Sequence, residues 1–261
     1  MMRQVASSKL GRLCLLGFVA VCLGGCSSGT YTWGWHIVSP FDARGLKNLS
    51  FLVDGFWATL SIACTSIAIS VVAGAAFAFM AISKAKALRW INRIYVEVFR
   101  AIPLLVLLLW VYYGLPVVFG IKLGIFAAGV IALSLSDAAF QAEIFRGGIQ
   151  SIAKGQMEAA QSLGLKDRQS MRLVILPQAL RRILPALGNQ FVYVLKSSSL
   201  VSVIGYQELT RRANELTLTE YRPLEIYTLL IVEYLILILI ASWMVRRLEA
   251  RMAPGEGMRG H

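Results

Sequence analysis

Long stretches without any charged residue most strongly limit what this chain can fold into. Residues 56–82 and 101–121 contain no Asp, Glu, Lys or Arg, and residues 226–245 contain only Glu233. About 20 apolar residues in a helix are enough to cross the ~30 Å hydrocarbon core of a bilayer. Each of these three stretches is therefore predicted to be a membrane-spanning helix.

Two further apolar blocks carry isolated charges. A block that begins at Leu123 meets its first charges at Asp137 and Glu143, and residues 183–207 are interrupted only by Lys196 and the serines that follow it. Charged residues make up 15% of the chain, whereas soluble domains carry about 25%. The sequence therefore predicts an all-α, polytopic membrane protein with five core helices and an N-terminal hydrophobic extension.

The Lys and Arg residues lie in short clusters between the apolar blocks. Residues 84–93, 146–182 and 246–259 carry four, seven and four of them. Because positively charged loops face the cytoplasm, these segments and the C-terminus are predicted to be cytoplasmic. The clustering also argues against nucleic-acid binding, which needs basic residues spread along one soluble face.

The N-terminal residues 1–26 are a separate feature. Basic residues precede a short apolar stretch, as in a secretory signal, and the stretch ends at Cys26 as a lipoprotein processing site would. The segment is either such a signal peptide, with Cys26 lipidated after cleavage, or a retained signal anchor. Both alternatives place residues 27–50 in the periplasm.

No metal or catalytic cluster is predicted. The four cysteines form no CxxC pair, and His36 and His261 are the only histidines. A nucleotide-binding loop of the form G-x-x-x-x-G-K-[ST] is also absent from the sequence. The chain is therefore expected to bind no cofactor of its own and not to be an enzyme.

The charged segment between the third and fourth apolar blocks carries a long motif. It reads Glu-Ala-Ala, three residues, Gly, nine residues and an aliphatic-x-Leu-Pro sequence. Its main positions are Glu158, Ala159, Ala160, Gly164, Leu176 and Pro177. This pattern resembles the EAA motif of bacterial ABC importer permeases, in which the segment docks on the ATP-binding subunit.

Local physical chemistry agrees with that resemblance. Residues 158–163 have the composition of a short helix, and Gly164 can end it in a left-handed conformation. Pro177 is expected to prevent an uninterrupted helix and so to fix the angle at which the chain re-enters the membrane. Residues 144–182 are therefore predicted to form a cytoplasmic coupling loop.

Three further segments resemble one branch of these importers. Residues 99–105 (FRAIPLL) resemble the FRGTPLL signature of the polar amino acid permeases of the histidine, glutamine and glutamate type. Residues 139–143 (AFQAE) resemble AYxAE, and residues 195–200 (LKSSSL) resemble LKDTSL. Ser replaces the Asp and the Thr of the last signature, which removes a carboxylate expected to contact substrate. Ion or sugar import is the alternative within the ABC importers.

The resemblance also implies an assembly and a mechanism. The expected partners are two ATP-binding cassette subunits that use ATP and magnesium, a second permease copy or a paralogue, and a periplasmic amino-acid-binding protein. The expected location is the bacterial inner membrane, in contact with lipid, and transport is expected to proceed by alternating access. A secondary transporter would instead show inverted repeats, which are not visible in this sequence.

Charged and hydroxyl residues within the predicted spans are the candidates for a substrate pathway, because charge inside a membrane is costly. They are Lys196, Ser197, Ser198, Ser199, Asp137, Glu143 and Arg100. Lys196, where the helix is expected to loosen, either attracts a substrate carboxylate or pairs with Glu233 or Asp137. Asp137 either helps to hold a cationic amino acid or pairs with Arg100 or Lys196.

The predicted organisation follows from these segments. Residues 1–26 form the signal anchor or signal peptide and residues 27–50 a periplasmic segment. Residues 51–250 form the transmembrane permease domain, which includes the coupling loop. Residues 251–261 form a cytoplasmic tail.

Overall fold

The computed structural model describes residues 31–252. The predicted leader with Cys26, and residues 253–261 of the predicted tail 251–261, lie outside the described residues. The chain divides into two compact units, Met1–Trp35 and His36–His261. In the first unit, the rings of Trp33 and Trp35 stack with their centroids 5.4 Å apart.

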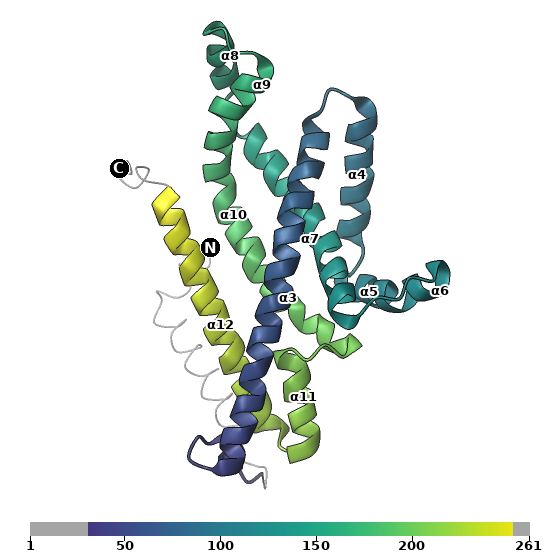
Figure 1. The fold of residues 1–261 in the computed structure, drawn as a ribbon. Helices are drawn as coiled ribbons and strands as arrows, with labels where there is room; N and C mark the ends of the chain where they lie inside the picture. Colours follow the sequence, from purple (N-terminus) through teal and green to yellow (C-terminus); the bar gives the residue numbers. More distant parts are fainter. Residues whose placement is uncertain (1–30, 253–261) are drawn as a thin grey trace, which may run out of the picture. The chain divides into compact units, whose positions relative to one another are not determined.

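All regular structure within residues 31–252 is helical, which confirms the predicted all-α class. Short 3-10 helices are η1 (Trp35–Val38) and η4 (Ser198–Ile204), and π-helices are η2 (Trp110–Gly114) and η3 (Met171–Ile175). The α-helices are α3 (Ala43–Ile82), α4 (Lys86–Ala101), α5 (Leu104–Leu109), α6 (Leu115–Phe119), α7 (Ile125–Gln150), α8 (Lys154–Ser162), α9 (Asp167–Ser170), α10 (Leu176–Ser197), α11 (Leu209–Glu220) and α12 (Pro223–Met252). Figure 1 shows their arrangement.

The first predicted span, residues 56–82, is the second part of a longer helix. Helix α3 has 40 residues, about 60 Å at 1.5 Å per residue, which is roughly twice the thickness of the hydrocarbon core. The helix begins where the Asp42 side chain accepts a hydrogen bond from the Arg44 backbone N–H at 2.8 Å. Such a side-chain cap satisfies one of the amide groups left unpaired at a helix N-terminus.

The second predicted span, residues 101–121, corresponds to the helical segment Leu104–Phe119, which does not meet the length-and-composition test for a membrane span by itself. Helix α4 precedes this segment and is bent by 102° from it. Pro103 causes the break, because it cannot donate a backbone hydrogen bond and forces Ile102 into an extended conformation (φ −77°, ψ 125°). Most of the charged stretch 84–93, predicted as a loop, is the first part of α4.

Within residues 31–252, three helices are long and apolar enough to cross a membrane, namely α3, α7 and α12, and the bent pair formed by α4 and Leu104–Phe119 is a fourth candidate. The predicted fourth and fifth blocks correspond to α10 with η4 and to α12. Helix α10 carries Arg181, Arg182 and Lys196, and it does not meet the same length-and-composition test. The number of five spanning segments therefore stays a prediction.

Helix α7 is the centre of the packing. In the most apolar 18-residue stretch of α7, 67% of the residues are buried, whereas in the corresponding stretch of α12 only 11% are buried. It packs along α3 and also contacts α4 and α10. Small residues such as Ala128, Ala132 and Ala139 are buried along it, and they let the neighbouring backbones approach closely.

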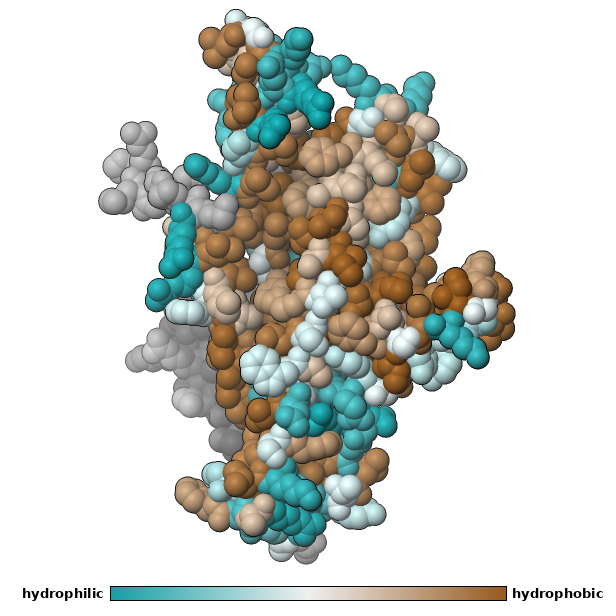
Figure 2. All heavy atoms as spheres, viewed as in Figure 1, coloured by the Kyte–Doolittle hydropathy of each residue, from teal (hydrophilic) through white to brown (hydrophobic). Residues whose placement is uncertain are grey.

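The two ends of the larger unit differ in what they carry. Figure 1 shows α8 and α9 at the same end as the turn between α3 and α4, with α11 at the opposite end. In Figure 2 the hydrophobic residues cover the middle of the visible face, and hydrophilic residues gather toward both ends. This distribution fits a protein that has a lipid-facing middle and two wet ends.

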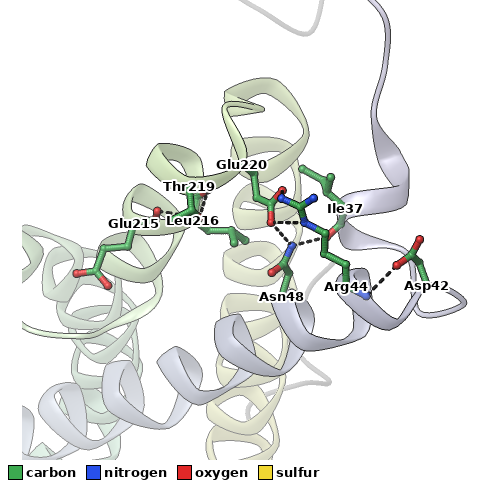
Figure 3. Close-up of polar contacts among 8 residues, drawn as sticks. All are labelled: Ile37, Asp42, Arg44, Asn48, Glu215, Leu216, Thr219 and Glu220. Carbon is green, nitrogen blue, oxygen red and sulfur yellow. Dashed lines mark hydrogen bonds and ion pairs between the residues drawn. The ribbon is translucent and has the colours of Figure 1, made fainter.

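The end that carries α11 is held by polar contacts between elements far apart in sequence (Figure 3). Arg44 forms an ion pair with Glu220 at 2.7 Å. Asn48 Nδ2 donates to the Ile37 carbonyl oxygen at 2.8 Å and to Glu220 Oε1 at 3.0 Å. The start of α3 is thus attached to the end of α11 by groups whose hydrogen bonds are satisfied.

Gly74 provides a test of the close approach between α3 and α7. An added Cβ at Gly74 would overlap Gln141 Cβ and would lie 3.0 Å from the Ala142 backbone nitrogen. We therefore expect Gly74→Ala to lower the free energy of unfolding by about 1–3 kcal/mol. Thermal unfolding of the purified protein in detergent measures the change.

Gly147→Ala is the matched control, because an added Cβ there has no atom within 4 Å beyond its own helix. It should leave stability unchanged or raise it by up to about 1 kcal/mol, since Ala favours the helix. Equal destabilisation by the two variants would contradict the close packing of α3 on α7.

Candidate functional site

The predicted coupling segment forms a helix and a defined turn. Helix α8 ends at Ser162, and Gly164 adopts φ +83°, the left-handed conformation expected for it. The Gly164 N–H donates to the Gln161 carbonyl oxygen at 2.9 Å, and the Leu165 N–H donates to that of Ala160 at 3.2 Å. These bonds satisfy carbonyl groups at the helix end, so the helix prediction for residues 158–163 and the role of Gly164 are confirmed.

The residues of the motif do not all lie on the same surface. Glu158 and Ala159 are exposed, whereas Ala160 is only 3% exposed and faces the rest of the segment. Leu163, which follows the helix, is 84% exposed despite its apolar side chain. The exposed surface of the segment therefore includes Ala159 and Leu163, and Ala160 packs against its own chain.

Polar contacts attach this segment to the rest of the unit. Asp167 accepts hydrogen bonds from Lys84 Nζ at 3.3 Å and from Gln161 Nε2 at 2.9 Å. These donors hold the pKa of the Asp167 carboxyl below its usual range. Arg182 donates to the Ser151 carbonyl oxygen at 2.6 Å. The coupling segment is thus connected to the turn between α3 and α4 and to α10.

Pro177 was predicted to interrupt the helix that re-enters the membrane, but no break in the helical chain occurs at Pro177. The chain passes from η3 into α10, which begins at Leu176, and Pro177 lies in its first turn. The turn Met171–Ile175 is π-helical, so its backbone hydrogen bonds span five residues where those of an α-helix span four. Pro177, which has no backbone N–H to donate, follows two residues after this turn. Pro177 is exposed and Leu176 is half-buried.

Asp137 lies in a polar cluster between three helices. The buried carboxylate accepts hydrogen bonds from Ser70 Oγ of α3, from Gln141 Nε2 of α7 at 3.1 Å and from Gln190 Nε2 of α10 at 2.5 Å. No ion pair of Asp137 occurs within residues 31–252, so the predicted pairing with Arg100 or Lys196 is wrong. Three neutral hydrogen-bond donors contact the Asp137 carboxylate where a cation was predicted.

Lys196 and the serines after it mark a change of helix type. Helix α10 ends at Ser197 and continues as the 3-10 helix η4. The change of helix type therefore occurs at the predicted place, but the chain winds more tightly there instead of loosening. Ser198 and Ser199 donate to the carbonyl oxygens of Leu195 and Lys196, at 2.7 and 2.8 Å. Lys196 is exposed and has no ion pair among the described residues. The predicted pairing with Glu233 or Asp137 is therefore not formed.

Arg100 and Glu143 lie together at a polar cavity between α4 and α7. Its volume is about 500 Å³. Glu143 forms a two-point ion pair with Arg146 at 3.0 and 2.7 Å, and the Arg100 guanidinium lies 5.3 Å from the centre of the Phe140 ring. The lining residues are Ala81, Arg89, Asn92, Arg93, Val96, Glu97, Arg100, Glu143 and Arg146. We call this space the α4–α7 cavity.

The structure therefore separates the predicted pathway residues into three places. Asp137 belongs to the cluster between α3, α7 and α10, Lys196 to the junction of α10 and η4, and Arg100 with Glu143 to the α4–α7 cavity. Sequence reasoning missed the polar face of α4. Charged residues at positions 86, 89, 93, 97 and 100 recur at helical spacing, and that period could have identified it.

Comparison with known proteins agrees with these features. Residues 70–254 match the family described as binding-protein-dependent transport system inner membrane component. The probable glutamine ABC transporter permease protein GlnM of Bacillus subtilis (strain 168) is 40% identical over 205 residues, 78% of this chain and 94% of that protein. The arginine transport system permease protein ArtQ of the same strain is 36% identical over 211 residues, 81% of this chain and 96% of that protein.

Solved structures show the same fold. A crystal structure of an amino acid ABC transporter with histidines has a TM-score of 0.75 and 41% sequence identity, and covers 79% of this chain and 96% of that one. A bacterial ABC transporter for the polysaccharide alginate shares the fold at 14% identity, with a TM-score of 0.60, over 96% of this chain and 98% of the other.

The family match covers most of the described chain, and the relatives are named as permeases, that is, as transport components rather than enzymes. The apolar helices and the family place the chain in the inner membrane as a multi-pass protein. The chain belongs to the binding-protein-dependent transport system inner membrane components, the permease subunits of ABC importers, and within them to the polar amino acid type.

Proposed function

We propose that this permease carries polar amino acids across the inner membrane by alternating access, driven by ATP hydrolysis on a separate subunit. The single observation that supports this most strongly is α8, a short capped helix at the hydrophilic end, with exposed Ala159 and Leu163. A rigid exposed helix attached to α10 and to the turn between α3 and α4 can transmit motion of a partner into the membrane helices.

The proposed assembly contains two ATP-binding cassette subunits, which use ATP and magnesium, and two permease chains, either copies of this chain or a paralogue. The ATPase subunits contact the α8 end, and a periplasmic amino-acid-binding protein contacts the α11 end. The C-terminus then lies in the cytoplasm, since α12 leaves the α11 end and runs toward the α8 end (Figure 1).

Polar amino acids are the proposed substrates, because the relatives are named for glutamine and arginine transport. Uptake of radiolabelled glutamine, arginine, histidine and glutamate into proteoliposomes that hold the complete complex tests this. One or more of them should accumulate and be displaced by an excess of the same unlabelled amino acid. Accumulation of a sugar or an inorganic ion, with none of the four amino acids, would contradict the proposal.

The proposed substrate pathway includes the junction of α10 and η4, with Lys196 and Ser197–Ser199, together with Asp137, Glu143 and Arg100. Lys196 is the sharpest test, since it is an exposed charge without an ion pair in the described part of the chain. Intramembrane charges of this kind usually face a substrate path.

We expect Lys196→Met to lower the rate of uptake at least about tenfold, because it removes a charge-assisted contact with the substrate carboxylate. Lys196→Arg keeps the charge and should retain most of the activity. Normal uptake by a correctly folded Lys196→Met complex would exclude Lys196 from the pathway.

A further inference from the structure

The α4–α7 cavity is a built polar site that the coupling segment does not explain. It holds four arginines and two glutamates, and it also contains Asn92. The Asn92 side chain is 94% buried, and its Oδ1 has no hydrogen-bond partner among the described residues. A buried amide oxygen without a partner is costly unless a ligand or water supplies a donor.

Several charged side chains in this cavity form hydrogen-bonded ion pairs with each other. Glu143 is held by Arg146 through two hydrogen bonds, and Glu97 accepts one hydrogen bond from Arg93 through Oε1. Glu97 Oε2 and the Arg100 guanidinium make no hydrogen bond within residues 31–252. The cavity therefore contains one carboxylate oxygen, Glu97 Oε2, and one guanidinium, that of Arg100, that can form hydrogen bonds with a ligand.

These two groups lie on the same face of α4. Glu97 and Arg100 are three residues apart, so their Cβ atoms are about 5–6 Å apart, one helical turn along the face. They do not pair with each other, because Glu97 bonds to Arg93 and Arg100 lies over Phe140. Two opposite charges one turn apart can hold a ligand that carries both charges on groups bonded to the same carbon atom.

We propose that the α4–α7 cavity binds the zwitterionic head of a free amino acid. The Arg100 guanidinium binds the α-carboxylate, while Glu97 Oε2 and the rotatable amide of Asn92 accept hydrogen bonds from the α-ammonium group. The cavity is distinct from the junction at Lys196 and from the Asp137 cluster. One of its lining residues, Ala81, lies at the end of α3, next to the turn between α3 and α4, and this turn is at the α8 end (Figure 1). The inference rests on the proposed function and adds a substrate site on the cytoplasmic side.

The mixture of charges decides between two ligand chemistries. An anionic phosphate head group could accept hydrogen bonds from the arginines, but it has no donor for Asn92 Oδ1 or for Glu97 Oε2. A zwitterion makes use of both signs. The volume of about 500 Å³ also holds a whole amino acid, so the side chain needs no separate pocket.

Direct binding to the intact complex tests the proposal. Equilibrium dialysis of radiolabelled glutamine, arginine, histidine and glutamate is performed with the permease–ATPase complex in nanodiscs, without binding protein and nucleotide. The wild-type complex should show a saturable class of sites for at least one of them. We expect Arg100→Gln and Asn92→Leu each to weaken that class at least about tenfold.

Ligand analogues separate recognition from folding. The decarboxylated amine of the bound amino acid lacks the group that Arg100 holds, so Arg100→Gln should leave its weak binding unchanged. The N-acetyl derivative lacks the ammonium group, so Asn92→Leu should not weaken it further. Lys122→Gln removes a positive charge in the turn after α6 and serves as the control, with binding unchanged.

Each outcome decides the matter. No saturable site in the wild-type complex, or binding that neither variant weakens, would overturn the inference while uptake by the complete complex still supports the proposed function. Equal weakening of the amino acid and its analogues would show that Arg100 is structural, and this too would overturn it. Loss of amino-acid uptake by the wild-type complex would count against the proposed function itself.

Discussion

Replacement of Leu163 by Asp is expected to detach the ATP-binding subunits from the permease and to abolish ATP-driven uptake. Leu163 is 84% exposed next to the turn at Gly164, and the exposed Ala159 lies one turn before it. An apolar anchor at the centre of an interface contributes about 2 kcal/mol or more, and a carboxylate in its place must lose its hydration on docking. Copurification of the ATPase with a tagged permease measures the effect.

Leu218→Asp is the matched control for this variant. Leu218 is 71% exposed on α11, at the opposite end of the unit, so the same substitution should leave the ATPase bound. Both variants should fold, because neither side chain is buried. If Leu163→Asp copurifies as much ATPase as Leu218→Asp does, α8 is not the docking helix.

Removal of the Asp137 carboxylate is expected to have the largest effect on stability. Asp137→Ala would leave the buried donors of Ser70, Gln141 and Gln190 without their common acceptor. Each buried neutral donor left without an acceptor costs about 1–3 kcal/mol. Thermal or denaturant unfolding of the purified permease, without substrate, measures the loss.

Asp137→Asn separates the structural role from a role in transport. The amide keeps the volume and one acceptor oxygen, so it should retain more than half of the stability that Ala loses. If Asp137→Ala unfolds like the wild type but no longer supports uptake, the cluster does not hold the helices together and Asp137 acts in the pathway instead.

The coupling segment could be predicted well because its signals are local. Ala159 and Ala160 favour a helix, and Gly164 is the residue type that tolerates φ +83°. The same signals could not show that Ala160 faces inward while Leu163 faces outward, because that depends on how α8 packs against α9 and η3.

Helix α4 was not predicted because hydropathy and charge counting treat each charge as a mark of a loop. Lys86, Arg89, Arg93, Glu97 and Arg100 instead form one polar face of a helix whose other faces expose apolar residues such as Trp90 and Ile94. The bend at Pro103 was visible in the sequence as a residue that cannot continue a helix.

The partners of Asp137 could not be predicted from local patterns. Ser70 lies 67 positions before it and Gln190 lies 53 positions after it. A search for charged residues within apolar blocks does not single out neutral polar residues such as Ser70 and Gln190. Only the packing of α3, α7 and α10 brings them together, and it explains why neutral donors take the place of the predicted cation.

The measurement that tests the central claim most directly is uptake into proteoliposomes that contain the permease and its ATP-binding subunit. Binding protein and labelled amino acids are placed outside, and ATP is enclosed with magnesium inside. We predict that the amino acid accumulates only when hydrolysable ATP and the ATP-binding subunit are both present. Accumulation that follows an imposed ion gradient, without ATP or without the ATP-binding subunit, would contradict the account.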